Sequence, residues 1–512
     1  MLAILLCAGP SLAKEPGEVL PRGYRQTRSD TEQAVRELCQ ATADTGLFSG
    51  AVLVARGGNV VYADGFGLAN REWAIPNTTD TKFRLASVSK QFCSMVVMQL
   101  VQEGKIQLDD NITTHLPYYR KDTGTKIKVH HLLSHQSGIK DYTSEFNYRG
   151  TISRLAFDKD EFIKLHCSAD LIKEPGTIYS YCNAGYSILG IIIEKVTRKT
   201  FEQNIQERIF EPLRMVNSGY DRNRYVLQKR ASGYTLGPFG YENADYIDMD
   251  SSPGASGAIY STVEDMFLWD RALYTDQLLE EKYRDLMFTP NKEVPEVKAA
   301  GGRAHSTYGY GWQIYSRTHP VTKNKTKVVS HGGAINGFRA METRLVDDDA
   351  FVIVLCNLGD PYGANEVWNA VVRLSVELTH LVTGQPYRMP GKRSLTQDQR
   401  MYEIIRTEGL EASIEWFKAK GKAAAWGGTH WALSKRLIED GRVDDGLRLM
   451  EFDVETTPRK VWLLRKVAQA FLNNGRPAKA LELVKKGLML RPDDEEFKMI
   501  KTEAEQDLAN AK

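Results

Sequence analysis

The sequence lacks two features that would point to a membrane or to nucleic acid. No apolar run reaches the ~18 residues that a membrane-spanning helix requires. No block of five or more basic residues occurs, and the net charge is only +2, which argues against a nucleic-acid partner. Proline is sparse, at 18 of 512 residues. The composition, 42% apolar and 26% charged, excludes a disordered or fibrous chain, and the length favours two domains.

Cysteine is also scarce. The six cysteines include no C-x-x-C pair, so a thiolate metal site is not indicated. One of them, Cys7, lies in an apolar N-terminal stretch, and the other five are an odd number at irregular spacing: Cys39, Cys93, Cys167, Cys182 and Cys356. We therefore expect no disulfide framework, and the apolar core must stabilise the fold. Neither a metal nor an organic cofactor is indicated.

Residues 1–13 resemble the last part of a secretory signal peptide. The stretch Met1–Ala8 is apolar, and Ser11 and Ala13 place small residues where a cleavage site needs them. The sequence turns polar from Lys14. The basic segment that usually precedes the apolar one is missing, which a start codon assigned too far downstream would explain; the alternative is a simple apolar tail. We expect a periplasmic or secreted protein.

The pattern of strand-like and helical runs predicts an α+β domain over residues 30–385. Gly57-Gly58 separates two β-type runs, Gly50–Arg56 and Asn59–Ala63, which indicates a hairpin. An apolar helix is expected from Ser87 to about Glu103. Strand-like runs return late, at 310–315, 327–330, 337–345 and 351–356. Strands at both ends and helices in the middle predict one sheet that is assembled from both ends and covered by helices.

After a polar segment at 386–397, which we interpret as a linker, residues 398–512 predict helices alone. Five pairs of similar residues recur there at an offset of 34: Gly441 and Gly475, Leu447 and Leu481, Leu449 and Leu483, Leu437 and Phe471, and Pro458 and Pro492. This period is that of the tetratricopeptide repeat, a helical hairpin. Two alternatives stay open: ordinary helical hairpins, and repeats that only support the first domain and bind no protein partner.

The first candidate site motif opens the predicted apolar helix. Ser87-Val-Ser-Lys90 places a hydroxyl and an amine about one turn apart on one helix face. A serine at a helix N-terminus benefits from unpaired N–H groups and the helix dipole, and a partly buried lysine can act as a base. The spacing alone is weak evidence, because Ser137 and Lys140 repeat it without a long helix.

Two further motifs offer the groups that such a serine would need. Tyr181-Cys-Asn183 supplies a phenol for proton exchange and an amide for a substrate carbonyl, although Tyr241 and Asn243 have the same spacing in a polar loop. The segment His331–Ala334 ends a β-type run, where glycines would let a substrate backbone approach the strand. Taken singly, each motif is more often structural than catalytic.

Together, the order and broad spacing of the three motifs resemble those of the serine β-lactamase and penicillin-binding protein superfamily. Further stretches are similar to landmarks of its class C β-lactamase-like branch: residues 83–87, 104–110, 132–138, 257–262 and 308–312. The resemblance covers about residues 30–385. It implies a β-lactamase/transpeptidase-like fold, in which helices flank an antiparallel sheet, followed here by the helical C-terminal domain.

The resemblance also implies roles for the motif residues. Ser87 would attack a carbonyl and form an acyl-enzyme, and Lys90 would accept its proton, alone or with Tyr181. Tyr181 would protonate the leaving group and later help to activate water. The N–H groups of Ser87 and Ala334 would form the oxyanion hole. The residues expected to bind substrate are Asn183, His331, Gly332, Gly333 and Ala334.

The sequence departs from the family pattern at His331. No Lys-Thr-Gly and no Ser-Asp-Asn occur, so a neutral histidine stands where relatives often carry the lysine that grips the carboxylate of β-lactams. We therefore expect hydrolysis of a small peptide, amide or ester, of the D-amino-acid peptidase, DD-carboxypeptidase or esterase type. A β-lactamase and a non-catalytic binding or regulatory protein are the alternatives.

Overall fold

The computed structural model describes residues 20–510 except 28, 146–147, 149–150, 250–253, 291–296, 299–304, 361–364 and 421–429. The predicted signal segment, residues 1–13, lies outside the described residues. The chain divides into two compact units. The first ends at Lys392, apart from two short segments, Thr235–Glu242 and Asp360–Glu366, which belong to the second unit together with the chain from Arg393 onwards.

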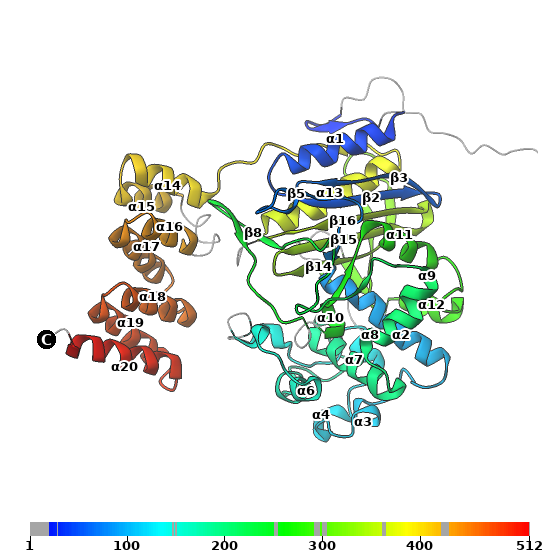
Figure 1. Ribbon diagram of the computed structural model, residues 1–512, viewed down its shortest axis with the longest axis horizontal. Coiled ribbons are helices and arrows are strands. Elements are labelled where there is room, and N and C mark those ends of the chain that lie inside the picture. The colour runs from blue at the N-terminus through cyan, green and yellow to red at the C-terminus, as the bar shows by residue number, and fades with distance from the viewer. Residues whose placement is uncertain are drawn as a thin grey trace, which may run out of the picture. The chain divides into compact units, whose positions relative to one another are not determined.

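An antiparallel sheet of eight strands forms the centre of the first unit (Figure 1). The early strand β2 pairs with the late strand β16 along its whole length, with Val54 opposite Val352. The chain therefore builds one sheet from both ends, as predicted, and the α+β fold class is confirmed. The strands in spatial order are β11 (Val297–Lys298), β12 (His305–Tyr308), β13 (Gln313–Thr318), β14 (Lys325–Ile335), β15 (Phe338–Leu345), β16 (Ala350–Cys356), β2 (Gly50–Arg56) and β3 (Asn59–Phe66).

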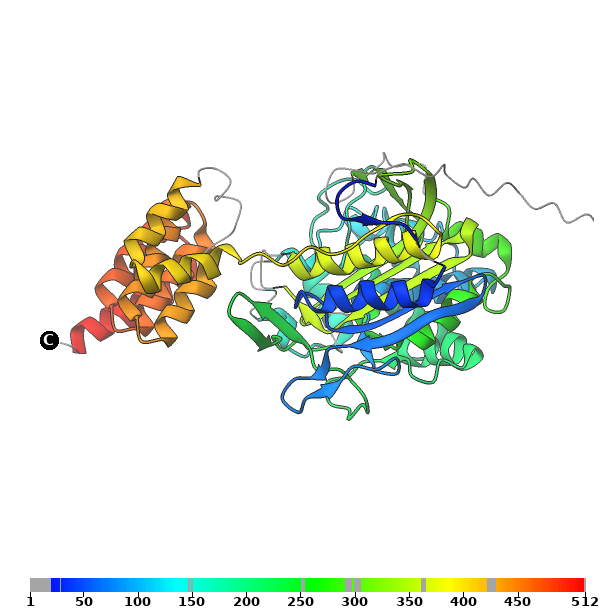
Figure 2. The ribbon, with the colours of Figure 1, turned by 90° about the horizontal axis from the view of Figure 1, so that it is seen from above.

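Helices cover both faces of this sheet. Helices α1 (Thr31–Ala43) and α13 (Glu366–Val382) lie side by side on one face (Figure 2). The other face packs against α11 (Val263–Ala272), and on that side the side chain of Gln91 in α2 (Ser89–Gln102) lies beside that of Glu342 in β15. The strands are therefore buried from both sides, which explains why β16 reads as the continuous apolar run Ala350–Cys356.

Helix α2 runs through the core, and nearly all of its residues are buried. A helix that is apolar all round belongs in such a place. The prediction placed its start at Ser87, whereas the α-helix begins at Ser89 after a 3₁₀ turn at Ala86–Val88. The other elements around the candidate site are β6 (Phe83–Arg84), β10 (Ile259–Ser261), β7 (Gly219–Tyr220), α5 (Val129–Leu133), α7 (Asn183–Thr197), α8 (Phe201–Ile205) and α10 (Gly254–Gly257).

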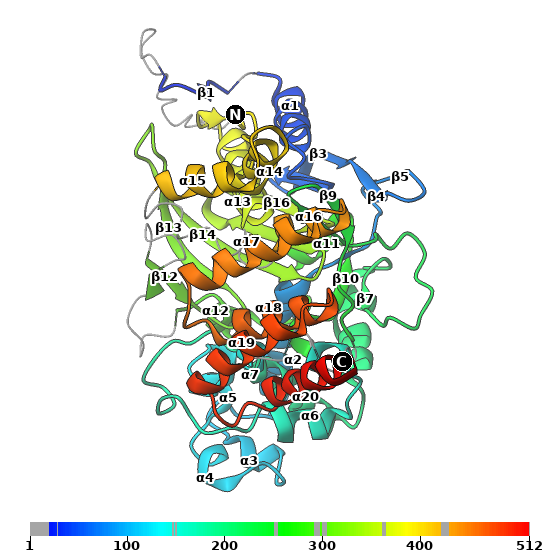
Figure 3. The same cartoon turned by 90° about the vertical axis from the view of Figure 1, so that its left-hand side faces the viewer.

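The described part of the second unit is built mainly from helices that follow one another as packed neighbours (Figure 3). They are α14 (Gln397–Thr407), α15 (Leu410–Ala419), α16 (Trp431–Glu439), α17 (Val443–Thr456), α18 (Val461–Asn473), α19 (Pro477–Leu490) and α20 (Glu495–Asn510). Close packing depends on small residues: a Cβ on Gly487 of α19 would lie 2.0 Å from the Phe497 ring of α20. Over the residues that the structure describes, no helix combines the length and apolarity needed to cross a membrane.

Candidate active site

Ser87 lies at a sharp elbow between strand β6 and helix α2. It occupies the middle of the 3₁₀ turn Ala86–Val88. Ala86 has a φ of 49°, in the left-handed region that residues with a Cβ rarely adopt. The neighbours Ala86 and Val88 are buried, but the Ser87 side chain stays partly exposed. The turn therefore presents the Ser87 hydroxyl at the surface of the site.

Lys90 is fully buried, and its amine contacts three oxygen atoms. Nζ lies 3.1 Å from Ser87 Oγ, 2.8 Å from Asn183 Oδ1 and 2.9 Å from the carbonyl oxygen of Ser256. The amide and carbonyl oxygens can only accept hydrogen bonds. A neutral amine would therefore donate its two hydrogens to them and keep its lone pair for the Ser87 hydroxyl, which is the geometry of a general base.

Burial makes that neutral amine available near physiological pH. Removal from water lowers the pKa of Lys90 from 10.5 to about 7, while the nearby carboxylate of Asp141 acts in the opposite direction. A base whose pKa lies near the working pH is well matched to proton transfer from a hydroxyl.

Tyr181 keeps its proton at neutral pH. Burial raises the pKa of the phenol well above its usual value, although a hydrogen bond with Ser87 acts in the opposite direction. Lys90 Nζ lies 4.9 Å from the centroid of the Tyr181 ring. Of the two groups beside Ser87, a neutral phenol is able to donate a proton and a neutral amine is able to accept one.

Asn183 is held by Asp141, a residue that the sequence analysis missed. Asp141 accepts hydrogen bonds from the backbone N–H of Asn183 at 2.8 Å and of Ala184 at 3.2 Å, and so satisfies the first turn of α7. It also accepts from Asn183 Nδ2 at 3.0 Å. The amide oxygen of Asn183 is thereby turned toward Lys90, where it accepts a hydrogen bond from the amine.

His331 is neutral and fully occupied by its neighbours. Its Nδ1 donates to the carbonyl oxygen of Gly332 at 2.7 Å, and the Tyr308 hydroxyl donates to Nε2 at 2.8 Å. Burial lowers the pKa of His331 to about 3. Strand β14 therefore carries no cation at the position where the resemblance implies a carboxylate-binding lysine.

The glycines of β14 permit close packing of the sheet against neighbouring elements. A Cβ on Gly333 would lie 2.1 Å from the Leu85 carbonyl oxygen, and one on Gly332 would lie 2.4 Å from the Trp368 ring. One edge of β14 extends beyond its neighbour β13. Strand β13 pairs with β14 only as far as Ser330, so residues 331–335 lack a β13 partner and Ala334 is exposed.

His135 is a second residue that the sequence analysis missed, although it lies within the quoted stretch 132–138. Its ring is buried among aromatic rings, with centroids 4.2 Å from Tyr181 and 4.6 Å from Tyr308. The backbone N–H of Cys182 donates to its Nδ1 at 3.1 Å. Since Nδ1 accepts, the proton is on Nε2, and burial holds the pKa of His135 well below its usual value. His135 thereby fixes the backbone between Tyr181 and Asn183.

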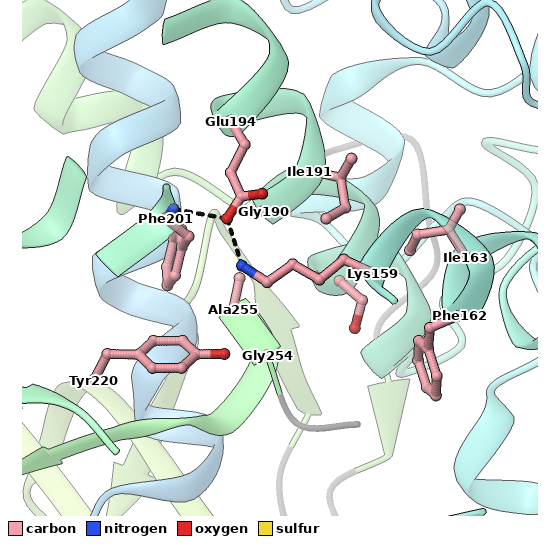
Figure 4. A pocket seen from close by; sticks show the side chains of 11 residues that line it. Lys159, Phe162, Ile163, Gly190, Ile191, Glu194, Phe201, Tyr220, Gly254 and Ala255 are labelled. Carbon is pink, nitrogen blue, oxygen red and sulfur yellow. Dashed lines mark hydrogen bonds and ion pairs between the residues drawn. The ribbon is translucent and has the colours of Figure 1, made fainter. Parts of the chain in front are cut away.

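Helix α10 brings the Ser256 carbonyl to Lys90, and its other side borders a cavity of about 30 Å³ (Figure 4). Lys159 Nζ and the Phe201 N–H both donate to Glu194 at this cavity, at 2.6 and 2.8 Å. The helices α7 and α10 meet where Gly190 faces Ala255, and a Cβ on Gly190 would lie 2.6 Å from that of Ala255. The position of α10, and with it the Ser256 oxygen, depends on this contact.

The structure thus brings Ser87, Lys90, Tyr181 and Asn183 together, and His331 lies beside them, with its ring centroid 6.3 Å from that of Tyr181. The two other pairs with the same spacings, Ser137 with Lys140 and Tyr241 with Asn243, do not form a comparable cluster. Ser137 is buried while Lys140 is exposed, and Tyr241 and Asn243 are exposed on strand β9 (Gly240–Asn243). In the described part of the chain, no three histidine, cysteine or acidic side chains gather closely enough to hold a metal ion.

Comparison with known proteins gives several matches. The model of the family described as Beta-lactamase matches residues 32–377. Penicillin-binding protein 4* of Bacillus subtilis (strain 168) is 27% identical over 377 residues, which cover 71% of this chain and 78% of the relative. The penicillin binding protein from Bacillus halodurans superposes with a TM-score of 0.55 at 27% identity, over 65% of this chain and 98% of that one. D-amino acid amidase from Ochrobactrum anthropi SV3 shares the fold, with a TM-score of 0.57 at 24% identity over 68% of this chain and 98% of that one.

Proposed function

Because this chain belongs to the beta-lactamase family and is a serine hydrolase, we propose that Ser87 is its nucleophile and that it hydrolyses a small peptide, amide or ester. The family match confirms the resemblance predicted from the motifs. The observation that carries the proposal is the environment of Lys90, whose two carbonyl acceptors leave its lone pair for Ser87 Oγ at 3.1 Å.

The first half of the reaction forms the acyl-enzyme. Lys90 Nζ takes the proton of Ser87 as Oγ forms a bond to the substrate carbonyl carbon, and the carbonyl oxygen becomes an oxyanion. The N–H groups of Ser87 and Ala334 would stabilise that charge. Tyr181 then donates its proton to the departing nitrogen or oxygen, the bond to the leaving group breaks, and the protonated Lys90 returns a proton to Tyr181.

The second half reverses these roles with water. Neutral Lys90 or the Tyr181–Lys90 pair removes a proton from a water molecule, which attacks the ester carbonyl of the acyl-enzyme. The second oxyanion occupies the same hole. Ser87 Oγ leaves, recovers a proton from Lys90, and the acid product is released.

The neutral state of His331 favours some of the candidate substrate classes over others. Efficient β-lactam capture through β14 would need a cation there, and His331 stays uncharged down to about pH 3. Peptides, amides and esters, whose scissile carbonyl needs no neighbouring carboxylate, suit this strand better. We place a β-lactamase activity second.

The experiment compares the native chain with Ser87→Ala. Both are treated with a fluorophosphonate and with a fluorescent penicillin, and then with p-nitrophenyl esters, D-amino-acid amides, D-Ala-D-Ala peptides and a chromogenic cephalosporin. We expect Ser87-dependent labelling by the fluorophosphonate and faster turnover of esters or amides than of the cephalosporin. Absence of Ser87-dependent labelling by both probes would refute the hydrolase mechanism.

We also propose the division of the chain into a hydrolase domain at 30–385, a linker at 386–397 and a helical domain of tetratricopeptide type at 398–512. Helices α17 and α19 begin 34 residues apart, which supports the proposed repeat. A periplasmic or secreted location, with residues 1–13 as a signal segment, belongs to the same proposal. Pull-down and crosslinking experiments with the full chain would test whether the C-terminal helices bind a protein partner.

A further inference from the structure

A cavity of about 580 Å³ in the first unit is lined by three arginines, Arg84, Arg224 and Arg230. Its walls come from strand β6, from the loop around residues 223–233, from residues 244–247 and from the turn after β14. The volume is in the range of small-molecule binding sites. None of the motif residues lines it, so the proposed chemistry does not explain it.

The cavity lies next to the proposed reaction centre along two separate chain segments. Arg84 precedes Ser87 by three residues, so their Cα atoms are at most about 11 Å apart. On the facing side, the lining residues Asn336 and Phe338 follow Ala334 within four residues. The two segments that would supply the oxyanion hole therefore continue into the walls of the cavity.

The charges around the cavity are positive on balance. Arg84 and Arg230 share one buried carboxylate, Asp221, at 2.6 and 2.8 Å. Asp245 also lines the cavity, but it is paired with Arg154 at 2.8 Å. Arg224 contacts the ring and hydroxyl of Tyr225, and within the described residues it makes no ion pair.

Donor groups remain available on these arginines. Arg84 binds Asp221 through Nε, and Arg230 binds it through Nη1, so neither guanidinium uses its full set of donors on Asp221. The Arg84 side chain is held over the Phe338 ring, with the guanidinium carbon 5.7 Å from the centroid. Because the Arg84 guanidinium is already held in place, it loses little conformational entropy when it binds a carboxylate with two parallel hydrogen bonds.

We propose that this cavity is a subsite for a carboxylate carried by the substrate, at a distance from the scissile carbonyl. The inference rests on the proposed function, because it places the scissile carbonyl at Ser87. Strand β14 offers no cation at His331 for a carboxylate next to the scissile bond, while Arg84, Arg224 and Arg230 offer a site for one farther along the substrate. The substrate class is thus narrowed to peptides, amides or esters whose chain bears a remote acidic group.

The test uses p-nitrophenyl monoesters of linear dicarboxylic acids of increasing length, each beside the same acyl chain ending in a methyl group. At the chain length that brings the carboxylate into the cavity, we expect kcat/KM for the acid-ended ester to be about ten times that for the methyl-ended ester. Arg224→Gln and Arg230→Gln should each lower this ratio. Arg222→Gln is the matched control, because Arg222 lies in the same loop, pairs with Glu202 and does not line the cavity.

A binding measurement keeps the proposal independent of turnover. Titration of Ser87→Ala with the free dicarboxylic acids, followed by calorimetry, should show binding that weakens in the Arg224→Gln background and at high salt. No preference for acid-ended esters at any length, or an equal fall of the ratio in Arg222→Gln, would overturn the subsite. If neither the esters nor the amides were hydrolysed but the acids still bound, the subsite would stand and the proposed reaction would fail.

Discussion

At the scale of single residues, the site depends on one buried amine whose protonation decides the reaction. The pKa of Lys90 is lowered from 10.5 to about 7 because the group is removed from water. The reactive form is the neutral one, which predominates above that value. Activity should therefore rise with pH through the neutral range and not near pH 10.

The first prediction concerns this pH dependence. For an uncharged ester, kcat/KM should fall about tenfold per unit below pH 6, with an acid limb near pH 7, and should level off above about pH 8. Initial rates measured across this range test it, with thermal stability followed at each pH to exclude unfolding. A limb below pH 5, where carboxylates titrate, would contradict the role of Lys90.

His135 should be a positioning residue for the Tyr181–Asn183 segment. In His135→Leu the Cys182 N–H loses its acceptor, and a buried unpaired donor costs about 1–3 kcal/mol. We expect kcat to fall at least tenfold with a smaller change in KM. His135→Asn should recover much of the loss, because its side-chain oxygen can occupy the place of Nδ1 and asparagine tolerates the φ of 59°.

The measurement is kcat and KM on one ester, together with the rate of labelling by a fluorophosphonate. Equal loss in His135→Asn and His135→Leu would show that the imidazole itself, and not its accepting atom, is needed.

The motifs predicted Ser87, Lys90, Tyr181 and Asn183 because side chains of suitable chemistry stand at characteristic spacings. They could not reveal Asp141 or His135, whose partners lie more than forty residues away along the chain. Only the packed loops bring an acceptor to the start of α7 or an imidazole to the Cys182 N–H. The sequence predicted that His331 is neutral. It could not show that the Tyr308 hydroxyl and the Gly332 carbonyl hydrogen-bond its two ring nitrogens, because those contacts depend on the folded backbone and on the orientation of the ring.

At the scale of elements, the contact between α7 and α10 sets the position of the Ser256 carbonyl that binds Lys90. Gly190→Ala would place its Cβ 2.6 Å from that of Ala255, so α10 must shift. We expect a loss of about 1–3 kcal/mol in unfolding free energy and a lower kcat, because Lys90 loses the alignment of one acceptor.

Gly185→Ala on the same helix is the control. Its Cβ would find its nearest atom at 3.4 Å, an ordinary contact, and alanine favours the helix. Chemical denaturation and ester hydrolysis of the two variants measure the difference. Equal behaviour of both would show that α10 is not positioned by Gly190.

The elements themselves were largely readable from the sequence. The hairpin of β2 and β3 was predicted because two β-type runs flank Gly57-Gly58, and the late strands because short apolar runs are bounded by polar residues or glycines. The 3₁₀ turn before α2 was not, because it depends on the left-handed Ala86, which no local preference of alanine favours. The glycines of β14 were interpreted as a place where a substrate backbone can approach the strand, and the sequence could not show that Leu85 and Trp368 pack closely against them.

At the scale of the whole molecule, the described residues at the proposed site all belong to the first unit. A chain ending at Lys392 should therefore keep its Ser87-dependent hydrolysis within about threefold of the full chain. The truncation would expose one apolar side chain of the segment Thr235–Glu242, because Phe239 packs against Tyr402 with ring centroids 5.0 Å apart and Tyr402 would be removed. Adding Phe239→Ser removes the apolar ring that truncation would expose.

Ester hydrolysis and calorimetry of the truncated and full chains test this prediction, and the full chain should show a transition that the truncated one lacks. Loss of activity in a folded truncated chain would show that the helices contribute to the reaction. The sequence could predict helices after residue 397 from composition and period. It could not predict that Thr235–Glu242 groups with them, because that contact joins residues far apart along the chain.

The distribution of thiols between the units has a practical consequence. The five cysteines that the structure describes are all buried, and all of them lie in the first unit: Cys39, Cys93, Cys167, Cys182 and Cys356. A maleimide added to the native protein should therefore react with none of them until that unit opens. During slow heating, mass spectrometry would count the labelled thiols at each temperature. The temperature at which labelling begins would report the unfolding of the hydrolase unit separately from that of the helices, without any engineered reporter.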